Sequence, residues 1–192
     1  DFTAREVVSI GVSLASALNH MHLRKILHRN LSTTTVMVLE ETGTPYIAEF
    51  SLVKNQNLAD LSAVGVPQVV ESLFTPESTG GKELDERTDI FLLGRLLFKV
   101  LTHRFTIGRV MAAKTDAAGL EQQRHPKFFD PSIPDEIDAV VHRCLSVDPA
   151  SRPASAKELM QLLETAWEKA SVRMALARMR DSVQDSNMAG AL

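Results

Sequence analysis

Residues 25–38, KILHRNLSTTTVMV, decide how the rest of the chain is interpreted. An apolar approach leads to the pair His28-Arg29, and a run of small hydroxyl-bearing residues, 32–35, leads back into apolar sequence. This pattern is typical of a catalytic loop held between two buried segments, yet the stretch has no carboxylate, the usual general base or magnesium ligand in such a loop. It is either a working site with unusual residues or a scaffold that has lost its chemistry.

The segments on either side of this loop predict a helix and a hairpin. Residues 3–23 repeat apolar side chains at helical spacing and begin with a capping box, Thr-x-x-Glu. After the loop, which we expect over 24–35, two short apolar runs at 36–39 and 45–48 flank a turn at Gly43. The predicted strands are therefore few and short.

Three further helices are predicted downstream. Residues 85–103 are apolar on nearly all sides, which places this helix at the centre of a domain. Residues 134–145 begin with a proline, which a first helical turn tolerates, and residues 155 to about 184 follow a second capping box. Residues 51–84 are irregular, and a possible helix lies near 108–118. The fold class predicted from these patterns is mainly α.

Composition limits the class of protein. The 192 residues are 44% hydrophobic, enough for one domain with a core, and a net charge of −3 favours neither nucleic acid nor an acidic membrane as partner. The single cysteine, Cys144, favours a reducing, cytoplasmic setting. No stretch has the length of a membrane span or the pattern of a signal peptide. The chain starts without Met, so we expect an excerpt or a processed product.

Five motifs in order resemble the C-terminal lobe of the eukaryotic-type protein kinase family. They match its catalytic loop, its metal-binding motif, the end of its activation segment, its central helix and its closing arginine segment: ILHRNL (26–31), IAEFSLVK (47–54), FTPES (74–78), DERTDIFLLGRLLFKVLT (85–102) and CLSVDPASRP (144–153). The resemblance implies a kinase-like C-terminal lobe with a short β-hairpin over 1–165, followed by a helical extension and frayed tail over 166–192.

The N-terminal kinase lobe is expected to be absent from these residues. No Gly-x-Gly-x-x-Gly occurs, and no Val-Ala-Ile-Lys-like strand precedes the first helix. In the family these elements cover the phosphates of ATP and bind them. We therefore expect such a lobe, if it exists, upstream in the full gene product.

Every catalytic position that the resemblance implies is substituted. Asn30 stands in place of the catalytic Asp, Ser32 in place of the phosphate-neutralising Lys, and Thr35 in place of an Asn that holds Mg²⁺. Glu49 stands in place of the metal-binding Asp, and Ser51 in place of the Gly two residues later. Because a carboxamide is not a base at neutral pH, these catalytic-loop positions are interpreted as degenerate, with Glu49 as the one candidate metal ligand.

The positions that hold such a lobe together keep the family's residues. The resemblance implies a stacked contact between His28 and Phe50, and backbone N–H bonds from the loop to Asp89. It also implies a buried ion pair between Glu77 and Arg152.

Plainer interpretations compete for several of these residues. His28 alone could be an ordinary core histidine, although five motifs in register argue against it. Glu49 could be a solvated carboxylate at a strand end, and the hydroxyls of residues 32–35 could satisfy the backbone of their own loop. Cys144, among apolar neighbours, is a core residue rather than a reactive thiol.

Two segments have possible regulatory or binding roles. The family resemblance implies that Arg29 pairs with a phosphorylated activation segment, for which Ser62 and Ser72 are the candidates. The tail carries an apolar stripe beside basic residues, and it could pack back on the lobe, dock to a partner helix or groove, or, less well, bind a membrane surface. The stripe consists of Val172, Leu176, Met179 and Val183, and the basic residues are Arg173, Arg178 and Arg180.

The sequence therefore predicts a pseudokinase-type lobe that binds proteins and transfers no phosphate. No cofactor is expected, although the family implies ATP and Mg²⁺. The alternative is the C-terminal lobe of a divergent ATP-dependent Ser/Thr protein kinase with residual activity. A third alternative is a truncated product without a function of its own.

Overall fold

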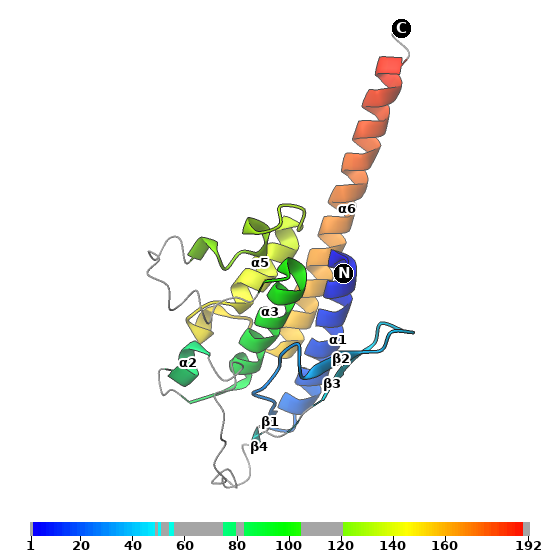
Figure 1. Cartoon of the computed structure of the whole chain (residues 1–192). Helices are drawn as coiled ribbons and strands as arrows, with labels where there is room; N and C mark the ends of the chain where they lie inside the picture. The colour runs from blue at the N-terminus through cyan, green and yellow to red at the C-terminus, as the bar shows by residue number, and fades with distance from the viewer. Residues whose placement is uncertain are drawn as a thin grey trace.

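Helices make up most of the computed structural model, which describes residues 2–48, 50, 54–55, 75–79, 83–104 and 121–189. Four of them form the body of the molecule: α1 (Ala4–His22), α3 (Glu86–Thr102), α5 (Asp135–Cys144) and α6 (Ala156–Ala189). They lie side by side, with α1 and α5 on either side of the first half of α6 (Figure 1). The prediction of a mainly helical fold is confirmed.

Helix α1 begins with the predicted capping box. The Thr3 hydroxyl accepts from the backbone N–H of Glu6 at 3.3 Å, and the Glu6 carboxylate accepts from the N–H of Thr3 at 2.7 Å. One face of the helix is then buried against α3 and α6, and it includes Leu14, Ala15 and Leu18. The capped start and the single apolar face explain why these residues form a helix.

Helix α3 lies at the centre of the core, as its all-round apolar sequence predicts. The four residues Ile90–Leu93 are all buried, and the helix contacts α1, α5 and α6. Asp85 caps its first turn by accepting from the N–H of Arg87 at 2.8 Å. Gly94 allows α5 to approach closely, because a Cβ there would lie 2.5 Å from the Cβ of Cys144.

The strands are short and stand beside the helices. The predicted hairpin forms from β2 (Val36–Val38) and β3 (Pro45–Ile47), paired antiparallel with Val36 opposite Ile47. Gly43 takes a positive φ of 67° in its turn. A second antiparallel pair, β1 (Ile26–Leu27) with β4 (Lys54–Asn55), lies within segments that were predicted to be loop and irregular sequence. Two residues are too few for a strand pattern to stand out.

Short helical turns complete the described fold. They are α2 (Pro76–Thr79), η2 (Pro126–Phe128) and η3 (Pro149–Ser151). The possible helix near 108–118 and most of the segment 51–84 lie outside the described residues. Among the helices that are described, none has a stretch that is both long and apolar enough to cross a bilayer.

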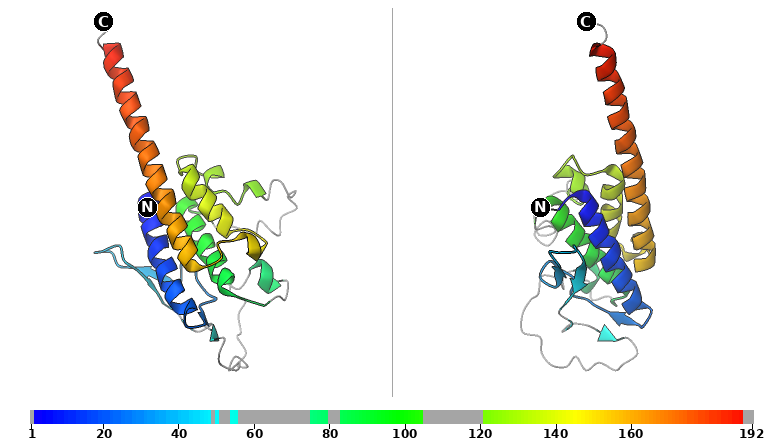
Figure 2. Two further views of the ribbon diagram at one scale, coloured as in Figure 1. Left: turned by 180° about the vertical axis from the view of Figure 1, so that it is seen from behind. Right: turned by 90° about the vertical axis from the view of Figure 1, so that its right-hand side faces the viewer.

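Helix α6 leaves the lobe halfway along its length. Leu159, Leu163 and Ala170 are buried, whereas Val172, Leu176 and Met179 are 57–67% exposed. The second half projects as a single rod in every view (Figures 1 and 2). The helix runs to Ala189, five residues past the predicted end. The interpretation in which the tail packs back on the lobe is therefore wrong for the stripe residues Val172, Leu176 and Met179, although Trp167 and Ala170 before them do pack on the lobe.

Candidate functional site

The loop after α1 is anchored by a single buried carboxylate at the start of α3. Asp89, fully buried, accepts from the backbone N–H of His28 at 2.9 Å through Oδ2 and from the N–H of Arg29 at 2.7 Å through Oδ1. These are the contacts that the resemblance implies for Asp89. They fix the position of the loop relative to the central helix.

His22 completes this anchor and was not singled out in the sequence. Its Nε2 lies 2.8 Å from Asp89 Oδ2, and because a carboxylate can only accept, Nε2 carries the donated proton. His22 is 3% exposed at the C-terminal end of α1. The sequence signal that could have identified His22 is its place on the buried face of the helix, four residues after Leu18. A polar side chain at such a place needs a hydrogen-bond partner.

The loop backbone at Arg29 is strained. Arg29 has a φ of 65°, in the left-handed region, which costs a non-glycine residue about 1–2 kcal/mol. The N–H bond from Arg29 to Asp89 holds the residue in this conformation. The Nε of Arg29 is buried and has no hydrogen-bond partner among the described residues. Ser62 and Ser72, the candidates to contact Arg29 when phosphorylated, lie outside them.

The hydroxyl of Thr35 is used inside the loop. It donates to the carbonyl oxygen of Asn30 at 2.7 Å and accepts from the N–H of Ser32 at 2.9 Å. Thr35 and Asn30 are 3% and 5% exposed. The side chain that stands in place of a magnesium-binding Asn therefore braces the loop's own backbone, as the plainer interpretation of residues 32–35 supposes.

The remaining loop hydroxyls also contact one another or the lobe. Ser32 Oγ lies 2.8 Å from Thr34 Oγ1, and Lys99 of α3 donates from Nζ to Thr33 Oγ1 at 2.5 Å.

The described donors do not fit the Mg²⁺ that the family implies. Magnesium requires oxygen ligands, usually carboxylates, in near-ideal octahedral geometry. Both oxygens of Asp89 already accept backbone N–H groups, and the Thr35 hydroxyl is turned into the loop. Within the described part of the chain, no three His, Cys, Asp or Glu side chains gather as a metal site. Glu49, with its neighbour Ser51, lies outside the described residues.

His28 and Phe50 are in contact, edge to face. Their ring centroids are 5.4 Å apart at an interplanar angle of 80°, a geometry that aromatic pairs favour. His28 is fully buried, whereas Phe50 is 55% exposed. More than half of the Phe50 surface is therefore exposed although its ring contacts His28.

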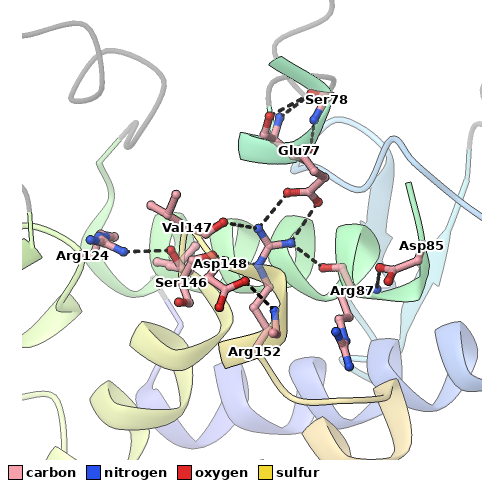
Figure 3. Close-up of polar contacts among 12 residues, drawn as sticks. Glu77, Ser78, Asp85, Arg87, Arg124, Ser146, Val147, Asp148 and Arg152 are labelled. Carbon is pink, nitrogen blue, oxygen red and sulfur yellow. Dashed lines mark hydrogen bonds and ion pairs between the residues drawn. The ribbon is translucent and has the colours of Figure 1, made fainter. Parts of the chain in front are cut away.

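Glu77 and Arg152 form a buried, bidentate ion pair (Figure 3). Arg152 Nη1 donates to Glu77 Oε1 at 2.9 Å and Nη2 to Oε2 at 2.8 Å. Arg152 also donates to the carbonyl oxygens of Ser146 and Arg87, at 2.8 and 2.9 Å, and its guanidinium lies 4.6 Å from the ring centroid of Phe91. This pair ties α2 to the residue that ends η3.

The ion pair sets the protonation of Glu77. Burial by itself raises the pKa of Glu77, but the hydrogen bonds and positive charge of Arg152 outweigh burial and leave the pKa below its ordinary value. Glu77 is therefore ionised at neutral pH, and Arg152 has a full negative partner inside the lobe.

Comparison with known proteins supports the same assignment. The model of the protein tyrosine and serine/threonine kinase family matches residues 1–163. A probable serine/threonine-protein kinase of Clostridium perfringens is 25% identical over 158 residues, and another of Streptomyces coelicolor is 28% identical over 155. These matches cover 82% and 79% of this chain but 23% of each relative, so the chain spans about a quarter of their length.

A solved structure shows the same fold. The crystal structure of the PknI kinase domain from Mycobacterium tuberculosis matches 86% of this chain with a TM-score of 0.63 at 19% identity. The match covers 56% of that chain. With the anchored loop and the Glu77–Arg152 pair in place, the family match over residues 1–163 means that this chain belongs to the protein tyrosine and serine/threonine kinase family.

Proposed function

We propose that this kinase-family lobe transfers no phosphate and acts by binding other proteins. The observation that carries the proposal is the orientation of the Thr35 hydroxyl. It points into the loop, where it donates to the carbonyl oxygen of Asn30 and accepts from the N–H of Ser32. A loop whose polar side chains stabilise its own backbone has given up the groups that would face a substrate.

The substitutions remove several catalytic contributions together. A positioned general base is worth about 10²–10⁴ in rate, and Asn30 cannot act as one. Phosphoryl transfer depends on neutralising charge on the phosphoryl group, and Ser32 has none to offer. Glu49 keeps a carboxylate but adds a methylene, which changes the reach of a ligand to a geometrically demanding ion.

The scaffold contacts support a lobe that has kept its shape. The hydrogen bonds of the buried Asp89 anchor and of the Glu77–Arg152 pair are complete. A domain that keeps its framework and not its chemistry is suited to present surfaces to partners. We place it among proteins that bind proteins, with neither nucleic acid nor membrane as partner.

The second candidate is the C-terminal lobe of a Ser/Thr protein kinase with residual activity. The names of the bacterial relatives favour it, since they are described as serine/threonine-protein kinases. In this candidate an N-terminal lobe binds ATP, and Glu49 retains Mg²⁺.

A phosphoryl-transfer assay separates the two candidates. The full gene product that contains this chain is incubated with ATP and Mg²⁺, and phosphate incorporation is followed by mass spectrometry. We expect the wild type to incorporate no more phosphate than Glu49→Gln or Asn30→Ala. Incorporation by the wild type that Glu49→Gln abolishes would overturn the proposal in favour of the residual kinase.

Repair variants test the reason for inactivity. Asn30→Asp alone should remain inactive, because Ser32 still leaves the transferring phosphate without a cation. Adding Ser32→Lys and Thr35→Asn to Asn30→Asp gives a triple variant that has the family's residues at all three substituted positions of the catalytic loop. Activity of Asn30→Asp by itself would contradict the argument that several losses act together.

A further inference from the structure

The projecting half of α6 carries an exposed apolar stripe. Val172, Leu176 and Met179 are 60%, 57% and 67% exposed, at spacings of four and three residues. The sequence places Val183 one turn further along the same line. A shallow groove runs along this part of the helix, lined by apolar and charged side chains: Glu168, Lys169, Val172, Arg173, Leu176, Ala177 and Arg180.

The stripe faces away from the lobe. The residues that bury α6 against the lobe include Leu159, Leu163 and Ala170. At 3.6 residues per turn, the stripe lies about 140° around the helix from that buried seam. A second helix laid along the stripe would therefore meet α6 on the side opposite the lobe.

The two flanks of the stripe differ in charge. Lys169, Arg173 and Arg180 lie along one flank. The other flank carries Glu168, followed by the small residues Ala175 and Ser182. Arg173 is held in place by a bidentate pair with Glu136 of α5, at 3.0 Å for both contacts, and its guanidinium has further N–H donors.

We propose that this stripe is a dimerisation surface and that its occupant is α6 of a second copy of the chain, in parallel. Spacings of four and three residues are those of a coiled-coil seam. In a parallel pair the opposite flanks face each other, so Glu168 of one copy lies across from Arg173 of the other. The same contact forms twice, as a two-fold axis requires.

The charges disfavour an antiparallel pair, and the direction of the stripe leaves room for both lobes in a parallel one. In an antiparallel pair like flanks meet, which would bring Arg173 and Arg180 of one copy against those of the other. In the parallel pair each lobe lies on the outer side of its own helix, because the stripe faces away from it. The seam covers only about two heptads, so the dimer is weak and depends on protein concentration. This proposal does not depend on whether the lobe transfers phosphate.

Sedimentation equilibrium of the 192-residue chain tests whether the surface is used. We expect the mass to rise reversibly from 21.1 kDa toward twice that value as concentration increases. Leu176→Glu should keep the chain monomeric without lowering its melting temperature, because Leu176 is exposed in the monomer. Arg178→Glu, on the same helix away from the stripe, is the matched control and should dimerise like wild type. A wild type that stays monomeric at every concentration would overturn the proposal and leave the stripe to a different partner.

Cysteine crosslinking tests the orientation. The only native cysteine, Cys144, is buried and gives little background. In a parallel pair residue 179 faces its own counterpart, so Met179→Cys should form a crosslinked dimer under mild oxidation, and Arg178→Cys should not. Crosslinking that requires a mixture of Leu176→Cys and Met179→Cys chains would show an antiparallel pair and overturn the parallel arrangement.

Discussion

Asp89 is a buried carboxylate that no lysine or arginine neutralises among its described contacts. Three donors satisfy it: the His22 ring and the N–H groups of His28 and Arg29. Burying a charge is expensive unless hydrogen bonds replace its hydration, and here each oxygen has at least one. Asp89 thus couples the end of α1, the strained loop and the start of α3.

Replacing Asp89 by Asn should destabilise the lobe strongly. The amide has one accepting oxygen, so its NH₂ group must face either the Arg29 N–H or the donors from His22 and His28. The free energy of unfolding should fall by about 3 kcal/mol or more, since a hydrogen bond to a charged group is lost and a buried donor is left unpaired. Urea denaturation followed by circular dichroism measures this change.

Asp85→Asn is the matched control for that variant. Asp85 caps the same helix one turn earlier but is exposed, and Asn caps a helix about as well as Asp. Its unfolding free energy should stay within about 0.5 kcal/mol of wild type. If Asp89→Asn changed stability no more than Asp85→Asn, the anchor would not hold the loop.

The sequence predicts site positions better than site geometry. Asp89, Glu77 and Arg152 could be assigned because each sits in a short motif with a fixed role in the family. His22 could not, because its partner lies 67 residues away and only the fold brings them together. The same holds for Thr35, since nothing in a run of hydroxyl residues tells which one turns inward.

At the scale of elements, the contact between α3 and α5 leaves no room for a side chain at Gly94. A Cβ there would lie 2.5 Å from the Cβ of Cys144 and 3.5 Å from the backbone carbonyl carbon of that residue. Neither atom belongs to a flexible side-chain end, so the helices themselves would have to separate.

Gly94→Ala should therefore lower stability, although alanine is the better helix former. We expect a loss of about 1–3 kcal/mol, as for other overpacked cores, measured as a fall in the urea midpoint. Gly11→Ala on α1 is the control. The atoms nearest to its Cβ would be the side-chain ends of Leu97 and Leu163, at 3.1 Å, and these can shift. A larger loss for Gly11→Ala than for Gly94→Ala would contradict this explanation.

The ion pair that links α2 to the end of η3 predicts a pH dependence. Glu77 has a pKa below its ordinary value of 4.5, so its contribution to stability is complete above that value and is lost as the pH falls through the lower, folded value. At pH 7, Glu77→Gln should cost about 3–5 kcal/mol, because Arg152 is left buried without its counter-ion. The difference from wild type should shrink in acid, where Glu77 itself becomes neutral.

Urea denaturation of both proteins from pH 7 down to acid measures that difference. Glu6→Gln is the control. The N–H and hydroxyl of Thr3 also hold the pKa of Glu6 low, but at an exposed helix end, so the loss at neutral pH should be much smaller. A difference between wild type and Glu77→Gln that stays constant with pH would show that the buried charge is not its source.

At the scale of the molecule, the long elements could be predicted and the short ones could not. The positions of α1, α3, α5 and α6 follow from apolar periodicity and capping residues, which act within one helix. The β1–β4 pair depends on contacts between distant residues, Ile26 with Asn55 and Leu27 with Lys54. The projection of α6 beyond the lobe could not be predicted either, because an apolar stripe has the same pattern whether it is covered or not.

The chain described here folds around one core, so its central contact should open only when the whole lobe unfolds. Cys144 reports that contact: it is fully buried against α3, and burial raises the pKa of its thiol to about 12. We expect no reaction with a thiol reagent at pH 8 in native buffer. In urea, the labelling rate should rise in parallel with the fraction unfolded.

Destabilised variants make this prediction quantitative. When thiol labelling is slow relative to refolding of the opened lobe, the labelling rate follows the population of the open state. Each 1.4 kcal/mol of lost stability should then speed labelling about tenfold. Asp89→Asn acts at the start of α3 and Gly94→Ala near its middle, yet both should speed labelling by the factor that their urea midpoints imply. Asp85→Asn should leave the rate unchanged. Labelling that is fast without urea, or that ignores these variants, would mean that α5 opens by itself and that the 192 residues do not form one cooperative unit.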